Sequence, residues 1–194
     1  MLELEKLIGA IAAAFKDGGI EYVIVGSNAS MIWGEPRMTS DVDIIAQISP
    51  EKIDTLAATL KKPRFVLDDV AAKEIVRTGQ TFNIIDMETG LKVDITAKTD
   101  ARFDDSLFER RQLCEYPGGF SAYIASPEDT ILSKLLFYQI SGSDKHLRDV
   151  AGILAVSGNI LDMDYLNRWA KELAVFDLLS QIAEKCEVGL DKDD

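Results

Sequence analysis

The sequence predicts an α+β fold, in which a mixed sheet flanked by helices is followed by a C-terminal helical bundle. Two observations support this prediction. Up to residue 125, apolar β-branched runs such as 20–25 alternate with amphipathic segments such as 2–16, a pattern typical of a sheet with packed helices. From Ser126 onwards only amphipathic helical patterns follow. We therefore expect an α/β domain over residues 1–125 and a helical region over residues 126–194 packed on it.

Local start and stop signals indicate where the elements lie. Ser49-Pro50-Glu51 and Ser126-Pro127-Glu128-Asp129 each combine an N-cap hydroxyl, a proline and early acidic residues, which together favour a helix start. Helices are expected over residues 2–16, 50–62, 68–77, 101–113, 126–140, 145–156, 165–173 and 175–186. Strands are expected over residues 20–25, 41–45, 81–86, 91–96 and 120–125.

Composition argues against some classes of partner and site. The formal net charge of −12 at pH 7 argues against a broad basic surface for duplex DNA, although it leaves room for a local basic mouth. Cys114 and Cys186 lie far apart and outside any C-x-x-C spacing, so free buried thiols are favoured over a disulfide or a zinc site. The amphipathic residues 2–16 suit neither a secretory signal nor a membrane span. We expect a cytoplasmic protein with no membrane partner.

A strand that turns directly into a short helix is expected at Gly26-Ser27. The apolar run 20–25 suits a buried strand, and the glycine and serine suit a sharp turn after it. The first amides of a helix have no internal partner and carry a partial positive charge. Such a corner can therefore hold a phosphate, with the Ser27 hydroxyl as a further donor, although the pattern alone is weak evidence for a nucleotide site.

Carboxylates follow this corner at positions that suit a metal ion. Asp41 and Asp43 lie on an expected strand, where the period of two residues brings both to one face. Asp94 is the candidate third carboxylate, because the alternation over residues 91–96 presents it on a polar face together with Lys92. Hard cations such as Mg²⁺ take oxygen ligands, commonly one or two carboxylates with water and substrate phosphates. These residues therefore predict a metal–nucleotide site.

The motifs together resemble a known superfamily. Gly26-Ser27, Asp41-Val42-Asp43 and Lys92-Val93-Asp94 resemble the nucleotidyltransferases that include DNA polymerase beta and the minimal MNT-type enzymes. The likeness is greatest to the AbiEii-type toxin branch, because Ser126-Pro127-Glu128-Asp129 leading to Lys134, and the segment 145–150, add to it.

Several properties follow from this resemblance alone. It implies a nucleotidyltransferase-like sheet and an enzyme that transfers NMP from an NTP to a hydroxyl group. Gly26 and Ser27 would contact the phosphates of the nucleotide. Asp41 and Asp43 would bind two Mg²⁺ ions, and Asp94 would complete that site and help to activate the acceptor hydroxyl. In-line attack on the α-phosphorus is assisted by two metal ions, which activate the nucleophile and neutralise the departing pyrophosphate.

Three cations could contact the phosphates or the acceptor, because positive charge near a triphosphate offsets the charge that develops in the transition state. They are Arg37, Lys92 and Lys134. Each also has a structural interpretation: Lys134 can extend from an amphipathic helix into water, Arg37 can form a salt bridge in a loop, and Lys92 can be solvated. For His146, the only histidine, a capping or ion-pair role is favoured over general-base catalysis.

The acceptor and the partners stay open. The likeness to AbiEii-type enzymes suggests a toxin–antitoxin setting, with tRNA 3′ ends or a protein as acceptor and an antitoxin as partner. A small molecule such as an aminoglycoside is another option. A rival interpretation is a catalytically inactive nucleotidyltransferase-like module that binds a nucleotide or a partner. It is motivated by the corner Gly26-Ser27-Asn28, where many relatives have Gly-Gly-Ser or Gly-Gly-Thr.

Overall fold

The chain forms two compact units in the computed structural model, which describes residues 2–60 and 63–186. The first unit comprises the residues up to Val25 together with Met38–Ala125, and the second comprises Gly26–Arg37 together with the residues from Ser126 onwards. The predicted domain boundary at Ser126, with the helical region packed on the α/β domain, stays a prediction.

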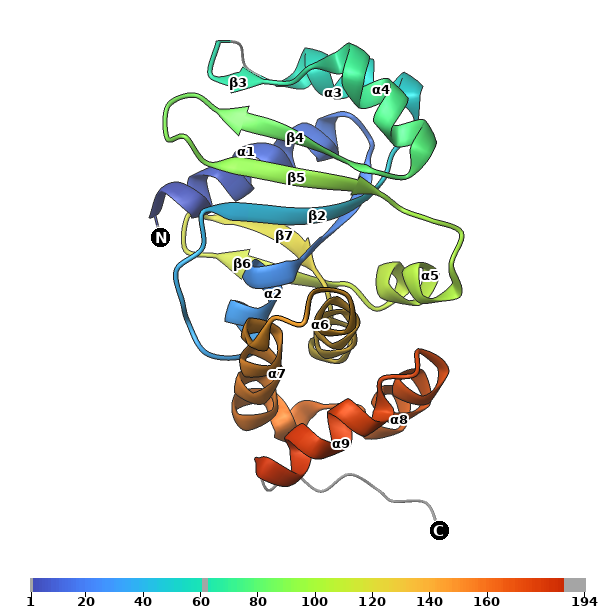
Figure 1. The fold of residues 1–194 in the computed structure, drawn as a ribbon. Coiled ribbons are helices and arrows are strands. Elements are labelled where there is room, and N and C mark those ends of the chain that lie inside the picture. The colour runs from blue at the N-terminus through green and yellow to red at the C-terminus, as the bar shows by residue number, and fades with distance from the viewer. Residues whose placement is uncertain (1, 61–62, 187–194) are drawn as a thin grey trace. The chain divides into compact units, whose positions relative to one another are not determined.

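The first unit contains a mixed sheet (Figure 1). Its strands are β1 (Glu21–Val25), β2 (Asp41–Gln47), β3 (Phe65–Val66), β4 (Thr81–Asp86), β5 (Lys92–Ala97), β6 (Gln112–Tyr116) and β7 (Phe120–Ile124). They are joined in the order β3-β4-β5-β2-β1-β7-β6. β2 pairs in parallel with β5 and β1 pairs in parallel with β7, whereas the other neighbours are antiparallel. The predicted mixed sheet is thereby confirmed.

Helices of the first unit pack on this sheet or on one another. They are α1 (Leu2–Asp17), α3 (Pro50–Thr59), α4 (Asp69–Thr78) and α5 (Arg102–Glu109). α1 packs against β1, β2 and β7, and α4 packs against β4. In α1 the side chains of Leu7, Ile11 and Phe15 are buried, because a spacing of four residues places them on one face. The helix predicted over residues 50–62 forms as α3 but ends at Thr59, and the last two predicted residues lie outside the described part of the chain.

The second unit is helical. It consists of α2 (Gly26–Trp33), α6 (Pro127–Ser141), α7 (Asp144–Ser157), the 3₁₀ turn η1 (Gly158–Ile160), α8 (Met163–Glu172) and α9 (Phe176–Lys185). α2 packs against α6 and α7, α6 packs against α8, and α9 packs against α7 and α8. The predicted C-terminal helical bundle is confirmed.

The start of α6 has the side-chain cap that the sequence indicates. The Ser126 hydroxyl accepts a hydrogen bond from the backbone N–H of Asp129 at 3.1 Å and donates to the Asp129 carboxylate at 2.9 Å. Such a cap satisfies an amide that has no partner within the helix. The Asp129 carboxylate also accepts a hydrogen bond from the Tyr165 hydroxyl, so the cap connects α6 with α8.

Two elements differ from the predictions. The helix expected over residues 101–113 is wrong in its second half, because α5 ends at Glu109 and Gln112–Tyr116 forms the edge strand β6. All five residues of β6 are exposed or half-buried, so the sequence shows no strand-like alternation there. Its strand conformation depends on antiparallel pairing with β7. The two-residue strand β3 was not predicted, since Phe65–Val66 is too short to show a period.

Two further expectations concern the thiols and the membrane. Cys114 and Cys186 are free thiols as predicted, but both are half-buried instead of buried. Within residues 2–60 and 63–186, no helix combines the length and the apolar character that crossing a membrane requires.

Candidate functional site

Carboxylates gather on the accessible face of the β2–β5 pair. The parallel register sets Asp43 beside Asp94 and Asp41 beside Lys92. The residues between them along each strand are buried, whereas the three aspartates are half-buried, so the aspartates share one face of the sheet. The backbone pairing of two adjacent strands therefore holds the three predicted carboxylates side by side.

The ammonium group of Lys92 lies among these carboxylates. Its Nζ is 2.6 Å from Asp94 Oδ2, and the two side chains are 46% and 21% exposed. The hydrogen bond to Asp94 and the negative charges of all three carboxylates raise the pKa of Lys92, so the lysine stays charged at neutral pH. The Thr39 hydroxyl donates to Asp41 Oδ1 at 2.7 Å. Lys92 and Thr39 thus engage two different members of the carboxylate group.

The chemistry of this group fits a hard divalent cation. Carboxylate oxygens are the ligands that Mg²⁺ takes in proteins, and the contact with the Lys92 ammonium indicates that the group attracts positive charge. In the part of the chain that the structure describes, no three acidic, histidine or cysteine side chains are already arranged to hold a metal ion. A metal ion at Asp94 would compete with the Lys92 ammonium, which contacts one of the two oxygens of that carboxylate.

The predicted phosphate corner forms the start of α2. Gly26 has a φ of 64°, a left-handed conformation that is costly for a residue with a Cβ atom. Its carbonyl accepts a hydrogen bond from the Ser30 hydroxyl at 2.9 Å. The Ser27 side chain is buried, and its hydroxyl accepts a hydrogen bond from Arg37 Nη2. The corner therefore requires glycine at position 26 and brings Ser27 and Arg37 together.

Arg37 and Lys134 converge on one carboxylate, that of Asp149 in α7. Arg37 donates to both of its oxygens, from Nε to Oδ1 at 3.0 Å and from Nη2 to Oδ2 at 3.1 Å. Lys134 Nζ is 2.7 Å from Oδ2, and the Lys134 and Asp149 side chains are only 5% and 7% exposed. Burial alone would raise the pKa of Asp149, but hydrogen bonds from Arg37 and Lys134 lower it below its usual value. An ionised Asp149 therefore holds both cations in place.

Asp149 is the residue of this cluster that sequence reasoning missed. The segment 145–150 contributed to the resemblance, but it named no partner for Asp149. Arg37 and Asp149 are 112 positions apart, so no local spacing connects them. The available signal is weak, because Asp149 is one of two acidic residues, with Asp144, among the cations at the start of α7.

His146 is a packing residue at the start of α7. Its ring stacks on Phe137 with the ring centroids 5.9 Å apart. Burial lowers the pKa of His146, and the charge of Lys134 lowers it further against the opposing effect of Asp149. The imidazole is therefore neutral at pH 7. Its backbone N–H, and not its side chain, donates to the carbonyl of Ser143.

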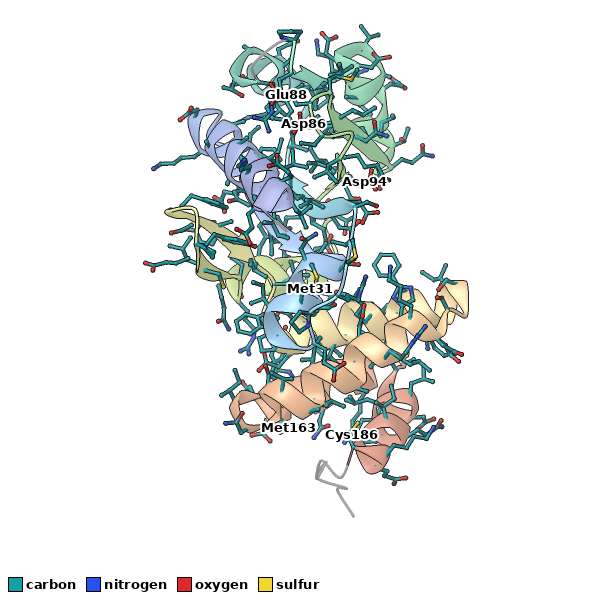
Figure 2. All side chains as sticks on the ribbon, turned by 90° about the vertical axis from the view of Figure 1, so that its left-hand side faces the viewer. Met31, Asp86, Glu88, Asp94, Met163 and Cys186 are labelled. Atoms are coloured by element: carbon teal, nitrogen blue, oxygen red, sulfur yellow. The ribbon has the colours of Figure 1, made fainter. Side chains whose placement is uncertain are left out.

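A further acidic pair supports the hairpin that carries Asp94. Asp86 is fully buried and pairs with Arg64 at 2.8 Å, and Arg64 also contacts Glu88 at 3.3 Å. The backbone N–H of Glu88 donates to Asp86 Oδ1 at 3.1 Å, which stabilises the turn from β4 to β5. Figure 2 shows Asp86 and Glu88 close to one another and Asp94 apart from them. This cluster therefore has a structural role.

Comparisons of the sequence identify one family. Residues 3–186 match the model of a family described as nucleotidyltransferase of unknown function (DUF6036). The match confirms the predicted resemblance to nucleotidyltransferases, whereas the likeness to the AbiEii-type branch stays a prediction. No curated protein matches the chain.

Solved structures of nucleotidyltransferase-like proteins are similar to this fold. An antigenic nucleotidyltransferase-like protein from Paracoccidioides brasiliensis is 17% identical, with a TM-score of 0.56 over 97% of this chain and 94% of that chain. A candidate nucleotidyltransferase from Thermotoga maritima is 14% identical, with a TM-score of 0.49 over 74% and 89%. The antibiotic-resistance factor ANT(2'')-Ia is 15% identical, with a TM-score of 0.47 over 88% and 95%. The first similarity confirms the predicted fold class.

Proposed function

The chain belongs to this family of nucleotidyltransferases, and on that premise we propose that it transfers a nucleoside monophosphate from an NTP to an acceptor hydroxyl. The observation that carries the proposal is the β2–β5 register, in which Asp43 lies beside Asp94 on the face that also holds Asp41. A set of carboxylates on neighbouring strands suits the metal ions that assist phosphoryl transfer.

In this proposal Asp41, Asp43 and Asp94 hold two Mg²⁺ ions. When bound, these ions would neutralise charge on the α-phosphate and the departing pyrophosphate and lower the pKa of the attacking hydroxyl. Asp94 orients the acceptor hydroxyl and helps to remove its proton. Lys92, released from Asp94, contacts a phosphate or the acceptor through its charged ammonium group.

Gly26 and Ser27 contact the phosphates through the first amides of α2 and the serine hydroxyl. Arg37 and Lys134 add positive charge to this corner. Two contacts support these roles: Arg37 donates to the Ser27 hydroxyl, and both cations share the Asp149 carboxylate. Because the cations are already ordered, phosphate binding loses less side-chain entropy.

The acceptor is a hydroxyl of a tRNA 3′ end, a protein or a small molecule, in a cytoplasmic toxin–antitoxin setting with an antitoxin partner. The net charge of −12 favours a protein or a small molecule over an extended RNA surface, because contacts to many RNA phosphates need clustered basic residues. The labelling experiment that identifies the acceptor also identifies the base of the NTP.

The test is transfer of label from each α-³²P-labelled NTP in the presence of Mg²⁺, with total tRNA, the protein itself and candidate partner proteins as acceptors. We expect Asp43→Asn to lower transfer on the order of a thousandfold, because it removes a charged metal ligand. Asp177→Asn makes the same chemical change at an exposed position of α9 and should retain transfer. Full transfer by Asp43→Asn would contradict the proposal.

A nucleotide-binding or partner-binding module without turnover is the second candidate. The ion pair between Lys92 and Asp94 favours it, because the lysine engages a carboxylate that the metal ions would need. NTP binding by the wild type, with no label transferred to any acceptor, would support this second function.

A further inference from the structure

The strand β6 leaves one edge of the sheet open. It is the last strand in the sheet order and pairs only with β7 among the described strands, at the end of the sheet opposite to β3 (Figure 1). Each of its five residues is exposed or half-buried. A strand at the edge of a sheet presents backbone N–H and C=O groups with which another strand can pair. The open edge of β6 is therefore a candidate interaction surface, and the function proposed above does not use it.

The backbone directions along β7 show which groups of β6 lie on the open edge. The Ala125 N–H donates to the Ile24 carbonyl of β1 at 2.9 Å, so the backbone groups of Ala125 face β1. These directions alternate along a strand. The even-numbered residues of β7 therefore face β6, where the register pairs them with the even-numbered residues of β6. Leu113 and Glu115 consequently direct their N–H and C=O groups outward, away from β7.

Apolar and charged side chains accompany these groups on one face of β6. Leu113 pairs with Tyr123 of β7, and these side chains are 59% and 38% exposed. The Arg111 guanidinium lies over the Tyr123 ring, 4.8 Å from its centroid, which places Arg111 on the same face as Leu113. The period of two residues adds Glu115 to that face. An exposed apolar pair therefore lies between a cation and a carboxylate.

The two charged residues differ in their contacts. Arg111 Nη2 donates to Glu21 at 2.8 Å, and the Glu21 side chain is 60% exposed. Glu115 is exposed, and within residues 2–60 and 63–186 it forms no ion pair. This acid can therefore receive a cation from a second strand.

The sequence of this edge is complementary to itself. When two copies of β6 run antiparallel about Leu113, each Leu113 faces the partner's Leu113 and each Arg111 faces the partner's Glu115. Opposite charges on facing residues stabilise a strand pair, and these odd-numbered residues are the ones whose backbone groups point outward. A shift by two residues in either direction loses both ion pairs, because Leu113 then faces a charged residue. Charge and backbone direction thus favour the same register.

We propose that β6 pairs with β6 of a second copy of this chain, antiparallel and about a two-fold axis at Leu113, so that the two sheets become one. A second copy fits this edge because the charge pattern is its own complement, as an interface with two-fold symmetry requires. The pairing also brings Leu113 and Tyr123 against the same residues of the partner subunit, which removes apolar surface from water.

The carboxylates of the candidate site lie outside this interface. β1 and β7 separate β6 from β2 in the sheet, so the pairing involves neither Asp41 nor Asp43. Asp43→Asn should therefore dimerise as the wild type does, and the dimer can be tested independently of nucleotide transfer. The net charge of −12 on each chain repels two copies at long range, so the contacts at β6 must supply the attraction.

Sedimentation velocity of the full chain over roughly 1–100 μM tests the dimer. The wild type should move toward twice the chain mass of 21.4 kDa as its concentration rises. Leu113→Lys and Leu113→Glu should each weaken the association by about tenfold or more, because like charges then face each other at the axis. An equimolar mixture of these two variants should associate about tenfold more tightly than either variant alone, because lysine then faces glutamate.

Matched controls show whether the effect belongs to β6. Ile160→Lys and Ile160→Glu introduce the same charges at a side chain that is also 59% exposed, and both should associate as the wild type does. Because Leu113 is exposed, its two variants should keep the far-ultraviolet circular dichroism spectrum of the wild type.

Cysteine cross-linking tests the register. In the proposed pairing Gln112 faces the partner's Cys114 in a non-hydrogen-bonded pair, where Cα atoms approach to about 4.5 Å and a disulfide can form. Burial raises the pKa of the Cys114 thiol, so the oxidation is carried out at about pH 9. Gln112→Cys/Cys186→Ser should give a covalent dimer on a non-reducing gel, whereas Cys186→Ser should give little. Equal cross-linking of both would contradict the register.

Three results would overturn the dimer. The first is a wild type that stays monomeric over the whole concentration range, which would leave the edge to a strand of a different protein. The second is unchanged association of Leu113→Lys and Leu113→Glu, which would place the dimer contact on another surface. The third is a mixture of these variants that associates no more tightly than either one alone.

Discussion

The carboxylates of β2 and β5 and the ion cluster around Asp149 are held by different forces. Backbone pairing of two strands positions Asp43 and Asp94, and the side chains lie on a half-buried face where they can exchange partners. In the second cluster the side chains themselves make the connection, since Asp149 joins Lys134 of α6 to Arg37 beyond α2. The carboxylates of β2 and β5 are positioned by strand pairing. The side chains around Asp149 themselves help to hold the helical unit together.

This difference predicts whether a substitution in each region mainly changes ligand binding or mainly changes the stability of the fold. A carboxylate on a paired strand can lose its charge while the strand remains in register. A buried carboxylate that pairs with two cations cannot, because the remaining charges stay out of water. Variants in the two regions should therefore give opposite patterns of stability and ligand binding.

The largest effect is expected for Asp149→Asn. Breaking a buried ion pair by removing one partner typically costs about 3–5 kcal/mol, so urea denaturation should show a much lower free energy of unfolding. Asp43→Asn, with the same chemical change, should alter that free energy by less than about 1 kcal/mol. Adding Lys134→Met to Asp149→Asn should restore part of the loss, since it removes the buried ammonium. If Asp149→Asn and Asp43→Asn had equal free energies of unfolding, the Asp149 ion pairs would contribute no more to stability than the Asp43 carboxylate does.

The second prediction concerns acid, which should reduce the free energy of unfolding by protonating Asp149. The pKa of Asp149 lies below its ordinary value of 3.8 in the folded chain, so the folded chain binds this proton more weakly than the unfolded chain does. The stability from Asp149 is present above pH 3.8 and is lost as the pH falls through the lower, folded pKa.

Urea denaturation over this acidic range checks the expectation. The free energy of unfolding of Asp149→Asn should fall less steeply on acidification than that of the wild type. Some slope should remain, because the pKa of the buried Asp86 is also lowered by its hydrogen bonds from Arg64, against the effect of burial. Parallel profiles for the wild type and Asp149→Asn would contradict the assignment of the slope to Asp149.

The smallest effect is expected for Lys92→Met. A metal ion competes with the Lys92 ammonium for the Asp94 carboxylate, and a half-exposed ion pair is worth at most about 1 kcal/mol. Mn²⁺, followed by electron paramagnetic resonance, should therefore bind this variant about fivefold more tightly than the wild type. Lys6→Met makes the same charge change at an exposed pair with Glu3 and should bind Mn²⁺ as the wild type does. Unchanged or weaker binding by Lys92→Met would show that the lysine does not compete with the metal ion.

Local sequence was sufficient for several features that depend on neighbouring residues, although Ser49, predicted to cap α3, makes no side-chain cap hydrogen bond. The Ser126 cap forms as predicted, because capping involves atoms within one helical turn. Asp41 and Asp43 share a face because the period of two residues is a property of any strand. Gly26, directly after β1, has a left-handed backbone conformation. Glycine is the residue best able to adopt that conformation.

Segments distant in sequence decided the rest of the candidate site. The parallel register that sets Asp43 beside Asp94 joins two strands whose own sequences do not specify their neighbour. The edge strand β6 has no buried stripe and was mistaken for helix, because only its pairing with β7 makes it a strand.

By itself, then, the sequence determined the order of most helices and strands, the turn at Gly26 and Ser27 from strand to helix, and the carboxylates that strand geometry places together. Only the tertiary structure decided that Arg37 and Lys134 share Asp149, and that Lys145 and Arg148 line a pocket with Arg37. The physical reason is the separation along the chain over which each kind of interaction acts. Capping and side-chain period act within a few residues, whereas ion pairs and pockets join side chains whose separation along the chain, 112 positions for Arg37 and Asp149, carries no local signal.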